Sequence, residues 1–138
     1  MKCTLILIRG VSGSGKTTYA RKLLQQHDNL VHLEADMYFY NDNQYIFNSS
    51  KLKQAHSWCL SNTTQCLKDG KSVVVSNTFT QKWEIQPYLD VAKLYNVDIN
   101  IMKAIGCYNN VHGVCPETVR RMQVRWQDVD GEQTIQAY

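Results

Sequence analysis

Eight residues near the start of the chain carry the clearest chemical signal. They read Gly10-Val11-Ser12-Gly13-Ser14-Gly15-Lys16-Thr17 and fit the pattern G-x-x-x-x-G-K-S/T at every fixed position. A polyphosphate needs backbone N–H groups that converge on it, and glycines permit the tight loop that supplies them. In this pattern Lys16 reaches the β- and γ-phosphates and the Thr17 hydroxyl is a Mg²⁺ ligand. The stretch predicts a nucleoside triphosphate site; the alternative is an ordinary glycine-rich turn.

The segments on either side of this loop favour the phosphate site. The run Cys3 to Ile8 is continuously apolar, as a strand buried on both faces should be, and Thr17 to His27 has apolar residues at helical spacing. A helix that begins at the loop points its unsatisfied N–H groups at the anion. We therefore expect the nucleotide to be bound by Gly10, Ser12, Gly13, Ser14, Gly15, Lys16, Thr17 and Thr18.

Alternating strands and helices predict the α/β class. Strands are expected at about 3–8, 29–35, 72–75 and 97–104, and helices at about 17–27, 51–68, 80–95 and from Pro116. Such alternation gives three layers, a parallel β-sheet flanked by helices, here a P-loop NTPase/kinase fold. Residues 37–47 read as neither helix nor buried strand, with 48–50 as helix-start residues. The residues from about 127 to 138 read as a frayed tail.

Length and composition indicate one ordinary globular domain over residues 1–138. The chain is 43% hydrophobic and 20% charged, and its net charge of +3 falls short of the basic stripe that grips duplex DNA. The apolar start is much shorter than a membrane span, so we expect a cytoplasmic protein without membrane contact. The five cysteines, with Cys59 and Cys66 on one predicted helix face, read as reduced core residues.

Polar side chains follow two of the predicted strands. Asp36 ends the second strand, where a carboxylate could take the proton from a hydroxyl that attacks the γ-phosphate. The alternatives are that it caps the next segment or holds Mg²⁺ through water. Asn77 and Thr78 follow the third strand and could contact substrate or a metal-bound water, or cap the following helix. The pair 112–113, His and Gly, could shape a turn or act in the chemistry.

Aromatic and basic side chains supply the remaining candidates. The segment after Asp36 carries Tyr38, Phe39, Tyr40, Tyr45 and Phe47, whose rings could stack a terminal base or pack beneath the loop as a small core. The last predicted helix carries Arg120, Arg121 and Arg125. These could neutralise a transferring phosphoryl group or form a solvated face.

With these residues placed, the chain resembles the polynucleotide 5′-kinase family, particularly its small kinase-like domains in phages, bacteria and larger eukaryotic proteins. The resemblance is carried by the blocks GVSGSGKTTYAR, LEADMYFY, YIFNSSKLKQAHSWC, VVVSNTFTQKWEIQPY and HGVCPETVRRM. It implies ATP and Mg²⁺ as cofactors and Asp36 as the general base. It also implies that the acceptor hydroxyl belongs to a nucleic acid 5′ end or a nucleotide, with Asn77, Thr78, Tyr38 and Phe39 near it.

The chain departs from the family's pattern at three places. Phe39 stands where an Arg would hold the substrate phosphate, Asn109 stands for the Arg of a shortened lid, and Ser76-Asn77 replaces the acid near the end of the third strand. We expect Arg120 or Arg121 to supply the missing charge. The leading hypothesis is an ATP-dependent kinase. The second is a nucleotide-binding module that senses or slowly hydrolyses ATP while bound to a partner.

Overall fold

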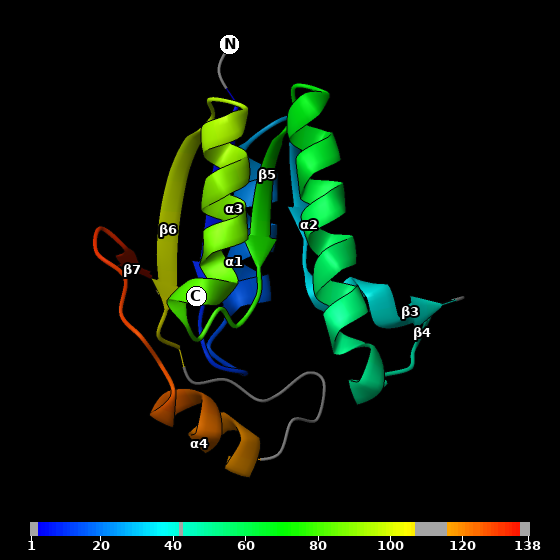
Figure 1. Cartoon of the computed structure of the whole chain (residues 1–138), viewed down its shortest axis with the longest axis vertical. Helices are drawn as coiled ribbons and strands as arrows, with labels where there is room; N and C mark the ends of the chain where they lie inside the picture. The colour runs from blue at the N-terminus through cyan, green and yellow to red at the C-terminus, as the bar shows by residue number, and fades with distance from the viewer. Residues whose placement is uncertain (1–2, 42, 107–115, 136–138) are drawn as a thin grey trace.

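A parallel sheet runs through the middle of the computed structural model, which describes residues 3–41, 43–106 and 116–135 (Figure 1). The order across the sheet is β2-β5-β1-β6-β7, and each neighbouring pair is parallel. The strands are β2 (Leu30–Leu33), β5 (Ser72–Ser76), β1 (Thr4–Arg9), β6 (Asp98–Ala104) and β7 (Gln133–Ile135). The four predicted strands and the parallel α/β architecture are confirmed.

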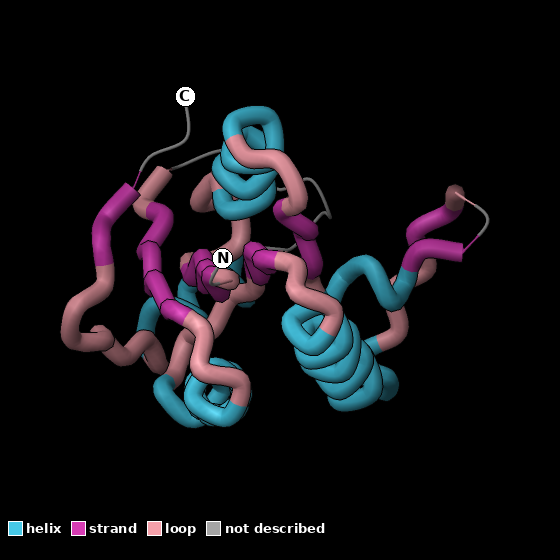
Figure 2. Tube along the Cα trace, turned by 90° about the horizontal axis from the view of Figure 1, so that it is seen from above, coloured by secondary structure: helices cyan, strands magenta, loops and turns pink. Residues whose placement is uncertain are grey.

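Helices cover both faces of the sheet, as Figure 2 shows from above. On one face α1 (Lys16–Gln26) packs Ala20 and Leu23 against Ile8 and Val74. On the other lie α2 (Leu52–Lys68) and α3 (Lys82–Leu94), over side chains that include Leu5, Leu7, Val73 and Val75. Successive strand residues point to opposite faces, so a strand covered on both sides has to be apolar throughout. Among the described helices none is long and apolar enough to cross a membrane.

The segment after β2 is more regular than the sequence suggested. It forms the 3-10 helix η1 (Ala35–Phe39) and a short antiparallel hairpin of β3 (Tyr40–Asn41) and β4 (Gln44–Tyr45). The prediction of no helix here was wrong, because η1 is helical, whereas the described residues of β3 and β4 are not buried. The helix start that follows is confirmed, because the Asn48 side chain accepts a hydrogen bond from the Ser50 amide at the beginning of η2 (Ser49–Lys51).

The prediction of a frayed tail was wrong for residues 127–135; residues 136–138 lie outside the described residues. The last helix, α4 (Pro116–Val124), begins at the expected proline, and the chain beyond it returns to the sheet as β7. Thr134 pairs with Lys103 of β6, and the Ile105 amide donates to the Ile135 carbonyl at 3.0 Å. The shortened lid with Asn109, and the pair at 112–113, lie outside the described residues.

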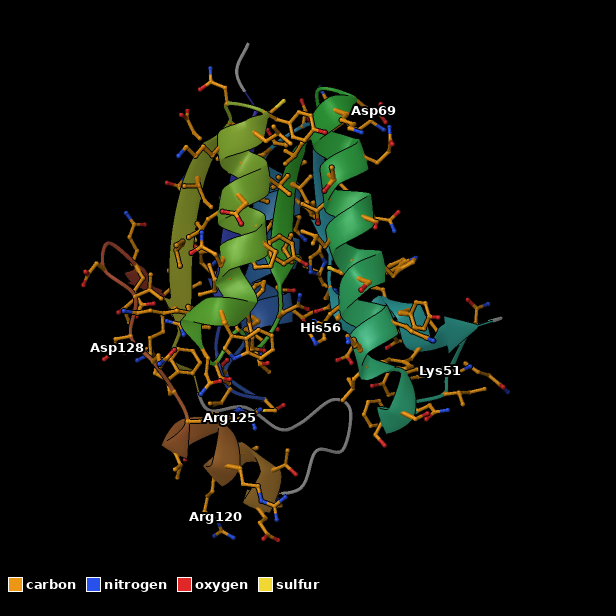
Figure 3. The ribbon with its side chains drawn as sticks, viewed as in Figure 1. Lys51, His56, Asp69, Arg120, Arg125 and Asp128 are labelled. Carbon is orange, nitrogen blue, oxygen red and sulfur yellow. The ribbon has the colours of Figure 1, made fainter. Side chains whose placement is uncertain are left out.

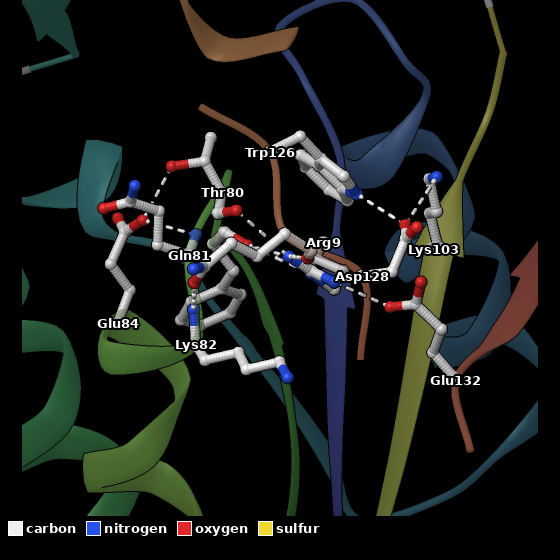
Figure 4. Close-up of polar contacts among 11 residues, drawn as sticks. Arg9, Thr80, Gln81, Lys82, Glu84, Lys103, Trp126, Asp128 and Glu132 are labelled. Carbon is white, nitrogen blue, oxygen red and sulfur yellow. Dashed lines mark hydrogen bonds and ion pairs between the residues drawn. The ribbon is translucent and has the colours of Figure 1, made fainter. Parts of the chain in front are cut away.

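One buried arginine holds this returning segment in place (Figure 4). Arg9, the last residue of β1, is fully buried. Its Nη2 donates to the carbonyls of Phe79 at 2.7 Å and Gln127 at 2.6 Å, and Nη1 bonds Glu132 Oε2 at 2.7 Å. The guanidinium also lies 4.0 Å from the centre of the Trp126 ring. Arg9 thus joins the end of β1 to the loop before α3 and to the chain between α4 and β7.

We predict that Arg9→Met lowers the free energy of unfolding by about 3–5 kcal/mol, because it leaves Glu132 and buried carbonyls without their donor. Urea unfolding measures the change. The matched control is Arg121→Met, which removes an arginine from an exposed ion pair on α4 and should cost less than about 1 kcal/mol. Equal losses in the two variants would contradict a structural role for Arg9.

Candidate active site

The loop Gly10–Thr17, called the P-loop below, connects β1 to α1 at the carboxyl edge of the sheet. Gly13 and Gly15 have φ of 82° and 95°, in the left-handed region that favours glycine. A Cβ on Gly10 would collide with Ser14 Oγ and come within 3.0 Å of the Ala104 carbonyl oxygen. The loop is anchored from outside by the Gly106 amide, which donates to the Ser14 carbonyl at 3.0 Å. Each of these three glycines is required by the backbone itself.

Two polar groups of the P-loop fit an anion. Ser14 Oγ is buried and has no hydrogen-bond partner among the described residues. Lys16 Nζ donates to a carbonyl of the loop itself, that of Val11, at 3.0 Å. A buried hydroxyl without a partner costs free energy, and a phosphate oxygen would satisfy it. The loop therefore has the donors that a phosphate chain needs.

Lys16 shows how the charges at this edge are arranged. Burial lowers its pKa to about 8, and the carboxylates of Glu34 and Asp36 partly oppose that shift. Both carboxylates therefore lie close enough to the P-loop to act on its lysine. Asp36 is half-buried in η1 directly after β2, and its Oδ1 accepts a hydrogen bond from the Tyr45 hydroxyl at 3.2 Å. The pKa of Tyr45 is raised, mainly by burial and secondly by the nearby Asp36 carboxylate. The phenol therefore stays protonated and remains a hydrogen-bond donor.

Glu34 was missed by the sequence reading. Its Oε2 accepts hydrogen bonds from Thr17 Oγ1 and from Ser76 Oγ, both at 2.9 Å. The resemblance expected an acid near the end of β5, where Ser76 stands, and the structure brings a carboxylate to Ser76 from the neighbouring strand. The available signal was a charged residue at the end of an apolar strand, two positions before Asp36.

Asn77, a predicted substrate contact, makes bracing contacts within the protein. Its Oδ1 accepts the Ala35 amide at 2.8 Å, its Nδ2 lies 3.8 Å from Cys59 Sγ, and the residue is buried. It therefore holds the start of η1, and with it Asp36, against α2. Thr78 contributes its carbonyl, which accepts the Gly10 amide at 3.1 Å and fixes the entrance of the P-loop.

The aromatic side chains divide into a buried and an exposed group. Phe39, predicted to contact substrate, is 5% exposed and belongs to the core, and half-buried Tyr38 packs against Trp58 with ring centres 6.1 Å apart. Phe39 and Tyr38 thus pack against other side chains, as in the alternative that the rings form a small core beneath the loop. The faces open to solvent belong instead to Tyr40 and Phe47, each about half exposed beside the hairpin.

A cavity of about 720 Å³ adjoins the P-loop. Its other walls are the end of β6 and α4, and its lining includes Ala104, Arg120, Gln123 and Trp126. A space of this size next to a phosphate loop can hold the nucleoside part of a nucleotide.

The three arginines of the α4 region differ in their contacts. Arg121 pairs with Glu117 at 3.1 Å, and Arg125 Nε donates to Thr80 Oγ1 at 3.0 Å. Arg120 has no hydrogen-bond or ion-pair partner among the described residues. In Figure 3 Arg125 lies between α4 and the strand ends, while Arg120 lies on the outer side of the helix. Arg120 contributes to the cavity lining, but its side chain is exposed, and it lacks the polar partners that Arg121 and Arg125 have in the described part of the chain.

Thiols and metal ligands add little to the site. Cys3, Cys59 and Cys66 are free thiols, and the last two lie on α2 as predicted. Among the described residues no three His, Cys, Asp or Glu side chains converge to hold a metal by themselves. Mg²⁺ that arrives with a nucleotide needs only one or two protein ligands, and the Thr17 hydroxyl at the start of α1 fits that requirement.

Comparison with known proteins agrees with this geometry. Residues 5–105 match the family model described as an AAA domain. The chain belongs to the AAA_33 family, a P-loop kinase-like family. Human NEDD4-binding protein 2 is 30% identical over 133 residues, which cover 89% of this chain but only 8% of that protein. This AAA domain therefore corresponds to a small part of its human relative.

Solved structures share the fold of this AAA domain. Pnkp1 in the Pnkp1/Rnl/Hen1 complex superimposes with a TM-score of 0.61 and 21% identity, over 94% of this chain and 42% of that chain. Chaetomium thermophilum Kti12, in complex with ADP-AlF3, superimposes with a TM-score of 0.69 and 15% identity, over 96% and 88%. These similarities show that the chain has the fold of these P-loop proteins.

We predict that Lys16→Met stabilises the nucleotide-free protein by about 1–3 kcal/mol near neutral pH, because it removes a buried ammonium. The pKa is about 8 when folded and 10.5 when unfolded, so between these values the unfolded chain binds more protons and wild-type stability rises with pH. The gain from Lys16→Met should therefore shrink from about pH 7 to about pH 9.5.

Urea unfolding at the two pH values measures this change, with Lys53→Met at an exposed position of α2 as the control. The control should change stability little at either pH. Lys16→Met should also lose ATP affinity, as a P-loop lysine variant must. A gain that stays constant with pH would contradict the burial of the Lys16 ammonium.

Proposed function

We propose that this AAA domain is an ATP- and Mg²⁺-dependent kinase that transfers the γ-phosphate to a 5′-hydroxyl of a nucleic acid end or of a nucleotide. The observation that carries the proposal is the position of Asp36. Its carboxylate lies at the carboxyl edge of the sheet, close enough to Lys16 to act on that ammonium, and is oriented by Tyr45. An ATP-binding module without an acceptor has no need of a base there.

In the proposed reaction Asp36 takes the proton of the acceptor hydroxyl. The acceptor oxygen forms a bond to the γ-phosphorus, and the bond to the oxygen bridging the β- and γ-phosphates breaks, with ADP taking its electron pair. Lys16 and the P-loop amides stabilise the charge on the phosphate oxygens. Thr17 would hold Mg²⁺, which neutralises the phosphates when bound. The cavity beside α4 would hold the nucleoside.

The exposed aromatics suit a nucleic acid acceptor. Tyr40 and Phe47 are exposed by 51% and 50% and belong to the same ring cluster as Tyr45, whose hydroxyl contacts Asp36. An aromatic face contributes about 1–3 kcal/mol when a base stacks on it. We propose that the terminal base of the acceptor stacks on these rings while its 5′-hydroxyl faces Asp36.

The contacts of the arginines favour a second candidate function, an ATP-binding module that transfers no phosphate to an acceptor. Arg121 and Arg125 are engaged with Glu117 and Thr80, and Phe39 is in the core where the resemblance expected an Arg. An NTP site in which these arginines are not available to the transferring phosphate suits a module that binds ATP and acts through a partner. The two functions differ in whether phosphate reaches an acceptor.

The experiment is incubation with γ-labelled ATP, Mg²⁺ and a panel of DNA and RNA oligonucleotides and nucleosides with free 5′-hydroxyls. The same oligonucleotides with a 5′-phosphate are the matched controls. A kinase labels only the first set. Release of labelled phosphate without a labelled acceptor supports the second function and contradicts the first.

Asp36→Asn tests the general base. It keeps the side-chain volume and removes the charge, so we predict a loss of transfer of at least about 100-fold. The dissociation constant for Mg·ATP should stay within a few-fold, because the P-loop binds ATP without Asp36. Equal loss of ATP binding would place Asp36 in the nucleotide or metal site, and unchanged transfer would remove it from the chemistry.

Arg120 and Arg121 form a second matched pair. Arg120 lines the cavity without a partner in the described part of the chain, so we predict that Arg120→Ala lowers kcat by about 10-fold or more. Arg121→Ala, which breaks an exposed pair with Glu117, should leave kcat within about twofold. Steady-state kinetics of both variants decide. If neither changes kcat, α4 is a solvated face and supplies no charge to the site.

A further inference from the structure

The strand ends beside the P-loop carry a chain of polar contacts that the proposed reaction does not use. His32 Nε2 lies 2.7 Å from Ser76 Oγ, Ser76 Oγ donates to Glu34 Oε2, and Thr17 Oγ1 donates to the same oxygen. Ser76 is 2% exposed, and the side chains of His32 and Glu34 are 7% and 14% exposed. Four side chains from β2, β5 and α1 thus meet in a largely water-free place.

The hydrogen atoms in this chain have one consistent arrangement. Ser76 gives its only hydrogen to Glu34, so its oxygen must accept from His32, whose Nε2 then carries hydrogen. Thr17 also gives its hydrogen to Glu34, and the lone pairs of its oxygen are left pointing elsewhere. A hydroxyl binds a cation through those lone pairs. The hydrogen bond to Glu34 therefore orients the Thr17 hydroxyl so that its oxygen can bind a cation.

The charge balance points the same way. Among the described residues no Lys or Arg nitrogen lies within ion-pair distance of Glu34; the Lys16 ammonium acts on it from farther away, and His32 Nε2 is 3.9 Å away. A nearly buried carboxylate whose hydrogen bonds in the described part of the chain come from hydroxyl groups is stabilised by a positive charge within direct reach. A divalent cation bound at Thr17 would supply that charge next to Glu34.

We propose that Glu34 is a positioning residue for the divalent cation of the nucleotide: it accepts the hydrogen bond of the Thr17 hydroxyl and places a negative charge beside the metal. Ser76 and His32 hold the carboxylate in that orientation. The inference rests on the proposed function, since the cation arrives with the nucleotide. The segment directly after β2 thus supplies both acidic groups of the site, Glu34 for the metal and Asp36 for the acceptor.

The test measures metal affinity without turnover, with Mn²⁺ and ADP as probes. The dissociation constant of Mn²⁺ from the protein–ADP complex is measured by electron paramagnetic resonance. The dissociation constant of ADP in excess EDTA is measured by calorimetry. We expect Glu34→Gln to weaken Mn²⁺ binding by about 10-fold or more and to leave ADP binding in EDTA within about twofold.

Two further variants separate this role from a purely structural one. Ser76→Ala removes the brace but keeps the carboxylate, and should weaken Mn²⁺ binding by about 2–5-fold without loss of metal-free ADP binding. Glu117→Gln on α4, an exposed carboxylate outside the site, is the control and should change neither constant. Circular dichroism checks that each variant is folded.

The outcomes distinguish this inference from the proposed function. Mn²⁺ affinity within twofold of wild type in Glu34→Gln would overturn the inference and leave the kinase proposal standing. Equal loss of ADP binding in EDTA would also overturn it, because Glu34 would then support the P-loop and not the metal. A wild-type protein that binds neither ADP nor Mn²⁺ with ADP would contradict the proposed function and this inference with it.

Discussion

A guanidinium buried at the end of β1 is the constraint on which the rest of the structure depends. A buried charge is stable only when its donors are satisfied, and Arg9 satisfies them with the carbonyls of Phe79, Thr80 and Gln127 and with the Glu132 carboxylate. These partners come from the loop before α3 and from the chain between α4 and β7. Because Gly10 follows Arg9 directly, the P-loop starts from a backbone position that all these segments hold together.

The carboxyl edge of the sheet concentrates opposite charges for a related reason. Parallel strands end on the same side, so β1 delivers the P-loop, and β2 delivers Glu34 and then Asp36 close to Lys16. Burial disfavours the Lys16 ammonium and the carboxylates favour it, which leaves a site that a phosphate chain and a cation complete. Asn77 ties the start of η1 to α2, so the position of Asp36 depends on the packing of a helix that carries none of the chemistry.

The parts of the fold that could be predicted are those whose signal is local. Local patterns predicted the conformation of three parts of the chain: the apolar runs of β1 and β5, the helical spacing of α2, and the glycines of the P-loop. β7 could not be predicted, because a three-residue strand of Gln, Thr and Ile has no sequence pattern of its own. It forms because it pairs with β6 and because the Arg9 contacts hold the preceding segment in place. The hairpin after η1 was missed for the same reason, since its strands have two residues each.

For the site, the sequence by itself determined the P-loop and the position of Asp36 at the end of a strand, because both follow from residue type and spacing along the chain. Only the tertiary structure decided which polar side chains meet. It placed the Glu34 carboxylate on Thr17 and Ser76, turned Asn77 into a brace, buried Phe39, and gave Arg121 and Arg125 polar partners that Arg120 lacks among the described residues. The physical reason is that hydrogen bonds and ion pairs join atoms that are close in space, and the distance between strands and helices is set by packing and not by sequence separation.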